Sequence, residues 1–113
     1  MSQYYFDVYG KVQKVMFRQT LMRAAKKRNL FAAASNDRTD PQHVLCYVEG
    51  DEKLCQEIME RIESGMQLNS WGAKASKLEV CERPESDFLY EEFEVNTKNV
   101  DDINWSEGVE FYL

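Results

Sequence analysis

Two polar side chains, Arg18 and Asn36, and the loop before Arg18 are the residues of this sequence best suited to bind an anion. The loop spans residues 10–17 and leads into a predicted helix, whose first backbone N–H groups lack partners within the helix and carry partial positive charge. Arg18, in the first helical turn, adds a planar guanidinium that can bind two phosphate oxygens together. Asn36 offers donors and an acceptor without a charge that would repel phosphate, so it can hold a water molecule. The predicted chemistry is phosphate binding beside a positioned water.

The fold must bring these residues together, because eighteen positions separate Arg18 from Asn36. Alternating apolar residues predict strands, whereas apolar residues spaced three and four apart predict amphipathic helices. Turn formers and glycines divide these segments. The expected elements are a strand over 4–10, a helix from 17 to about 28, a hairpin of 30–35 with 44–50, a helix over 51–65, a strand around 76–80 and a late strand over 90–95.

This order predicts an α+β fold of the ferredoxin-like type, an α/β sandwich with a βαββαβ plan and an additional late strand. The antiparallel sheet then carries two helices on one face. In this topology the first and second strands point the same way, and the third lies between them. The loop after Gly10 and the turn after Ser35 should therefore lie at one edge of the sheet, which places Arg18 near Asn36.

One run of residues resembles the signature of a known family. The run Gly10-Lys11-Val12-Gln13-Lys14-Val15-Met16-Phe17-Arg18 resembles the acylphosphatase signature G-[RK]-V-Q-G-V-x-F-R, with Lys14 in place of the second glycine. Residues 30–36 resemble the L-x-G-x-V-x-N segment of that family without its glycine and aromatic residue, and residues 48–50 and 93–95 resemble later strand ends. The resemblance covers about residues 4–95.

The resemblance implies hydrolysis of the carboxyl-phosphate anhydride bond of small-molecule acyl phosphates, giving a carboxylate and inorganic phosphate, with no cofactor and no metal. It assigns water orientation to Asn36 and phosphate binding to Arg18. It also assigns phosphate binding to the loop, mainly through backbone groups, at Gln13, Lys14, Val15, Met16 and Phe17.

Lys14 is the main departure, because a glycine in a phosphate-binding loop commonly supplies a positive φ angle or a close backbone approach. An ammonium group beside the anion would instead strengthen binding. Two functions follow from this difference. One is an active acylphosphatase, and the alternative is a non-catalytic binding or regulatory module of the same fold.

The composition restricts the partners. With 113 residues the chain is long enough for one domain, and its net charge of −6 disfavours nucleic acid and anionic membranes. The sequence has no long apolar stretch and does not begin like a signal peptide, so we expect a cytoplasmic protein. Its three cysteines are odd in number and widely spaced, which predicts small buried side chains rather than disulfides or a zinc site.

Two further features of the sequence lie outside the signature run. The domain is predicted to span residues 1–95, followed by a C-terminal extension at 96–113 in which apolar residues alternate. We expect this extension to pack on its own domain, with a protein contact or self-association as the alternative. His43 is predicted to be a solvent-facing residue at the same sheet edge.

Overall fold

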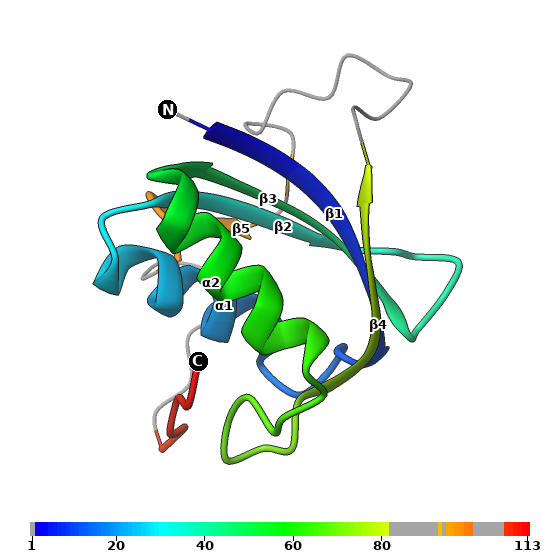
Figure 1. Cartoon of the computed structure of the whole chain (residues 1–113). Coiled ribbons are helices and arrows are strands. Elements are labelled where there is room, and N and C mark those ends of the chain that lie inside the picture. Colours follow the sequence, from blue (N-terminus) through cyan, green and yellow to red (C-terminus); the bar gives the residue numbers. More distant parts are fainter. Residues whose placement is uncertain (1, 82–92, 94, 101–107) are drawn as a thin grey trace.

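The computed structural model describes residues 2–81, 93, 95–100 and 108–113, which form one antiparallel sheet with two helices on one face (Figure 1). The first half consists of β1 (Ser2–Lys11), α1 (Phe17–Lys27), β2 (Phe31–Asn36) and β3 (His43–Gly50). The second half consists of α2 (Glu52–Glu63), β4 (Lys74–Cys81) and β5 (Val95–Asn96). The predicted ferredoxin-like α+β fold is confirmed.

The strand order β4-β1-β3-β2-β5 decides where the candidate residues lie. Strand β3 lies between β1 and β2 and is antiparallel to both, so β1 and β2 run in the same direction. Their C-terminal ends, at Lys11 and Asn36, therefore reach the same edge of the sheet. The late strand β5 pairs with β2 through Val95 and Asn96. Residues 90–92 and 94 of the predicted late strand lie outside the described residues.

The core lies between the sheet and the helices. Phe6 and Val8 of β1 are buried, as the predicted alternation requires. In α1 the apolar residues spaced three and four apart, Phe17, Leu21, Ala24 and Ala25, are also buried. Complete burial of a side chain such as Leu21 stabilises the fold by about 1.5–3 kcal/mol. Cys46 and Cys55 are buried too, as predicted. Val100 and Leu113, from the C-terminal extension, belong to the same buried cluster.

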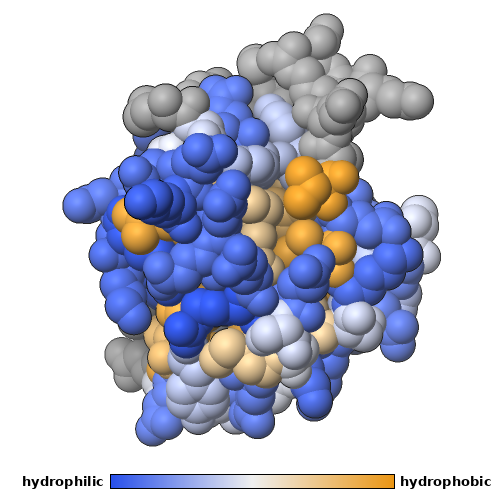
Figure 2. Space-filling view, in the orientation of Figure 1, coloured by the Kyte–Doolittle hydropathy of each residue, from blue (hydrophilic) through white to orange (hydrophobic). Residues whose placement is uncertain are grey.

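The outer surface is mostly hydrophilic on the face seen in Figure 2, with a small hydrophobic patch. A shallow depression between α2 and β4 is lined by Met59, Leu78 and Val80 together with polar residues of α2. Within the described residues, neither helix is long and apolar enough to cross a membrane.

Candidate functional site

Gly10 begins the loop and fixes how closely β1 approaches β4. Its φ angle is +132°, and a Cβ atom at this position would lie 2.7 Å from both the Lys74 carbonyl oxygen and the Ser76 backbone nitrogen. The Gly10 N–H donates to the carbonyl of Gln42 at 2.8 Å. Only glycine tolerates both the left-handed backbone and this contact with another strand.

The loop reaches α1 through two residues in the left-handed conformation, Lys14 with φ 64° and Met16 with φ 59°. Each such non-glycine residue costs about 1 kcal/mol. Lys14 therefore adopts the positive φ that the family glycine was expected to supply, so the side chain has not prevented that backbone conformation. Among the described residues, the N–H groups of residues 13–17 donate no hydrogen bonds.

The N-terminus of α1 has neither a side-chain cap nor an acidic residue in its first turn. Met16 is the N-cap residue and makes no side-chain cap, and the first turn holds no acidic residue. Unpartnered N–H groups and the helix dipole at such an end attract an anion. The positive φ angle expected at position 14 and the uncapped helix start are thus both present in the backbone.

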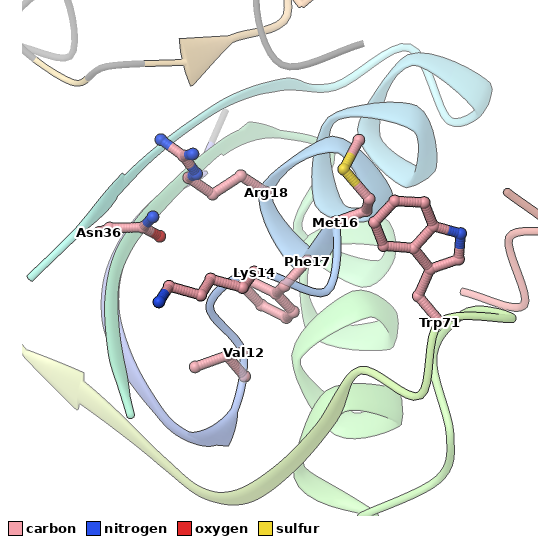
Figure 3. Close-up of a pocket in the computed structure, with 7 residues that line it drawn as sticks. All are labelled: Val12, Lys14, Met16, Phe17, Arg18, Asn36 and Trp71. Carbon is pink, nitrogen blue, oxygen red and sulfur yellow. The ribbon is translucent and has the colours of Figure 1, made fainter. Parts of the chain in front are cut away.

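A cavity of about 230 Å³ opens at this end of α1 (Figure 3). It is lined by Val12, Lys14, Met16, Phe17, Arg18, Asn36 and Trp71. Figure 3 shows the polar ends of Lys14, Arg18 and Asn36 on one side of the cavity, and Met16 with Trp71 on the other. The lining found in the described part of the chain has two cations and no carboxylate, so the pocket is locally positive on an acidic protein.

The structure thus brings Arg18 and Asn36 into one pocket, as their positions in the topology predicted. Asn36 is half-buried, and its side-chain Oδ1 is buried with no hydrogen-bond partner among the described residues. A buried acceptor without a partner costs about 1–3 kcal/mol, so this atom favours a bound water or ligand donor.

Two of the predicted loop residues do not line the cavity. Val15 is buried in the core. The side chain of Gln13 donates to the carbonyls of Asp37, Asp40 and His43 at 2.9, 2.9 and 2.8 Å. Gln13 was expected to act mainly through its backbone, whereas its side-chain amide also connects the 10–17 loop to the turn that follows Asn36.

His43 does not face solvent, and that prediction was wrong. Its ring lies between two carboxylates, with Nδ1 at 2.7 Å from Asp37 and Nε2 at 2.7 Å from Asp7, and it stacks on Tyr9. Its side chain is only 12% exposed and is not among the pocket residues. Burial lowers the pKa of His43, but the hydrogen bonds to Asp37 and Asp7 outweigh it, so the pKa lies above its ordinary value.

The opposite wall of the pocket comes from a segment in which the sequence indicated only a loop. Trp71 belongs to the turn between α2 and β4, lines the cavity and is 44% exposed. Asn69, in the same turn, is completely buried. The sequence Asn69-Ser70-Trp71-Gly72 has turn composition, but nothing in it indicates which part of the fold the turn contacts.

Together, these observations describe a small ferredoxin-like α+β domain with a locally positive pocket at the start of α1, which has no side-chain cap. The chain belongs to the acylphosphatase family, whose model, described as Acylphosphatase, matches residues 4–95. The resemblance predicted from residues 10–18 is therefore confirmed.

A solved structure supports this assignment. The crystal structure of acylphosphatase from Bacillus subtilis is 29% identical in sequence, with a TM-score of 0.59, over 75% of this chain and 90% of that chain. A search of the curated proteins gave no significant match.

Proposed function

We propose that this protein is an acylphosphatase that hydrolyses acyl phosphates to a carboxylate and inorganic phosphate. The observation that carries the proposal is the meeting of Arg18 and Asn36 in one pocket at the uncapped N-terminus of α1. Membership of the acylphosphatase family and the likeness to the Bacillus subtilis structure support it.

In the proposed reaction, the loop N–H groups of residues 13–17 and the Arg18 guanidinium hold the phosphoryl oxygens. Asn36 accepts a hydrogen bond from water through Oδ1 and aims its oxygen at phosphorus. A new oxygen–phosphorus bond forms while the bond between phosphorus and the bridging oxygen breaks, and the carboxylate leaves with the electron pair. The protons of the water pass to inorganic phosphate and solvent.

This reaction needs little acid catalysis, because a carboxylate is a good leaving group without protonation. Positioning of the water and stabilisation of charge on the phosphoryl oxygens account for the rate. The reaction as proposed requires neither a metal nor a cofactor. Lys14 contributes a second positive charge at the phosphate, and inorganic phosphate is expected to bind as a competitive product.

The test is release of inorganic phosphate from benzoyl phosphate by the wild type and by Arg18→Ala and Asn36→Ala. Each variant is expected to lose activity by about 100-fold to 1,000-fold, as for removal of one preorganised donor. Arg28→Ala is the matched control, because Arg28 lies at the other end of α1 and bonds Glu57 at 2.8 Å. That variant should keep wild-type turnover.

A wild type no faster than Arg18→Ala contradicts the proposal. Phosphate binding without turnover supports the non-catalytic binding module instead.

A further inference from the structure

Asn69 is a completely buried polar residue outside the residues assigned to the reaction, and both ends of its side-chain amide are engaged. Its Nδ2 donates to the Val15 carbonyl and to Thr20 Oγ1, each at 2.8 Å. Its Oδ1 accepts from the backbone N–H groups of Trp71 at 2.9 Å and Ala73 at 3.2 Å. One side chain therefore joins the phosphate loop, the first turn of α1 and the turn before β4.

The bond to Val15 falls at the most strained part of the loop. Val15 lies between Lys14 and Met16, the two residues held in the left-handed conformation. Backbone strain of this kind persists only where surrounding contacts over-determine the conformation. Gln13 holds the start of the loop through three hydrogen bonds, and Asn69 holds the carbonyl between the two strained residues.

The turn that carries Asn69 also makes hydrogen bonds to the C-terminal residues 110–112. The Ser70 N–H donates to the Glu110 carbonyl at 2.9 Å, and the Tyr112 N–H donates to the Leu68 carbonyl at 2.9 Å. Arg61, from α2, donates to the Tyr112 carbonyl at 2.8 Å. Asn69 thus bonds the loop to a turn that is itself hydrogen-bonded to residues 110–112, which in turn bond α2.

We propose that Asn69 is a positioning residue for the phosphate loop. Its amide keeps the Val15 carbonyl turned toward the interior, so that the N–H groups of residues 13–17 stay directed at the phosphate. The inference rests on the proposed function, because it assumes that this loop binds phosphate. Asn69 itself is not among the residues that line the cavity.

The test measures binding of inorganic phosphate by calorimetry for Asn69→Ala. Loss of the hydrogen bond from Asn69 to Val15 should weaken phosphate binding about tenfold. A tenfold change matches the strain of roughly one residue in the left-handed conformation. The effect should shrink when Lys14→Gly removes the left-handed strain, so Asn69→Ala is expected to weaken binding less than threefold in a Lys14→Gly background. A merely structural role of Asn69 would not depend on Lys14 in this way.

Asn29→Gly is the matched control, since Asn29 is also left-handed, with φ 57°, but follows the C-terminal end of α1. This substitution relieves strain far from the pocket and should leave the tenfold effect of Asn69→Ala intact. If Asn69→Ala does not fold, Asn69→Ser replaces it, because serine keeps an acceptor for the Trp71 N–H and lacks an amide that reaches Val15.

An unchanged phosphate affinity in a folded Asn69 variant overturns the inference. It is also overturned if Asn69→Ala weakens phosphate binding by the same factor in the Asn29→Gly and Lys14→Gly backgrounds. Failure of the proposed function gives a different result. Wild-type protein that binds phosphate without hydrolysing benzoyl phosphate overturns the enzyme alone, whereas absence of phosphate binding in the wild type overturns both.

Discussion

The N-terminus of α2 is capped by its own chain, whereas that of α1 has no side-chain cap. Asp51 precedes α2, and its carboxylate accepts from the Leu54 N–H at 3.1 Å, with Glu52 following in the first turn. At α1 the equivalent position is held by Met16 in a left-handed conformation, and a cation, Arg18, occupies the first turn.

On the proposed function, this difference separates a helix that supports the fold from one whose start binds a ligand. Both helices pack on the same face of the sheet (Figure 1). Each has free N–H groups and partial positive charge at its start. In α2 the chain supplies negative charge at the helix start, through Asp51 and Glu52, whereas the first turn of α1 holds the positive charge of Arg18. An external anion would therefore stabilise α1 more than α2.

The largest effect is expected when α1 is given the kind of cap that α2 has. Met16→Asp places a carboxylate at the helix start, where it competes with phosphate for the same N–H groups. Met16→Asn is the control, because both residues tolerate the left-handed backbone and only one is charged. Phosphate should bind about 30-fold more weakly to Met16→Asp than to Met16→Asn, which corresponds to about 2 kcal/mol. Calorimetry measures both, and equal affinities would contradict the anion site.

A smaller effect is expected from removal of the cap of α2. Asp51→Ala should lower the free energy of unfolding by about 1 kcal/mol and the melting temperature by about 4 °C. Asp51→Asn, which keeps an acceptor for the Leu54 N–H, should retain most of this stability. Thermal unfolding measures the change, and phosphate affinity should be the same in all three proteins. A loss of phosphate affinity in Asp51→Ala would contradict the proposal that only the start of α1 binds phosphate.

The residues that sequence analysis located correctly are those governed by local signals. The period of the apolar residues placed α1 from Phe17, and the strand order then placed Arg18 and Asn36 at one edge. Lys14 posed a conflict between residue type and expected backbone. In the structure Lys14 is left-handed. Gln13 and Asn69 connect this loop by hydrogen bonds to two other turns.

The contacts of Asn69 and His43 could not be predicted from the neighbouring sequence, because several of their partners lie far away in the chain. The bond from Asn69 to Val15 crosses 54 positions, and the carboxylates around His43 come from β1 and from the turn after Asn36. Turn composition predicts that residues 69–72 form a loop, but where the loop docks depends on packing of the whole domain. A histidine at the start of a strand likewise has no local feature that predicts two carboxylate partners.

The smallest expected effect concerns the turn beside the α1 entry, where the chain again neutralises its own charge. Asp37 directly follows Asn36, but its carboxylate bonds His43 and Thr39. The hydrogen bonds from His43 and Thr39 hold the pKa of Asp37 well below its ordinary value of 3.8. Asp37 therefore stays ionised from pH 6 to pH 9 in folded and unfolded chains, and its stabilisation is lost only in acid.

His43 should then determine the pH dependence of this turn between pH 6 and pH 9. Its pKa in the folded protein is raised above the ordinary value of 6.5, so its stabilisation is complete below about pH 6.5 and is lost as pH rises through the folded pKa. Burial and the neighbouring Asp7 raise the pKa of Tyr9, which stacks on His43, above 10.0, and it titrates outside this window. We expect a lower melting temperature at pH 9 than at pH 6, and a smaller difference in His43→Gln. Equal differences in the two proteins would show that the His43 contacts with Asp7 and Asp37 do not contribute to this pH dependence.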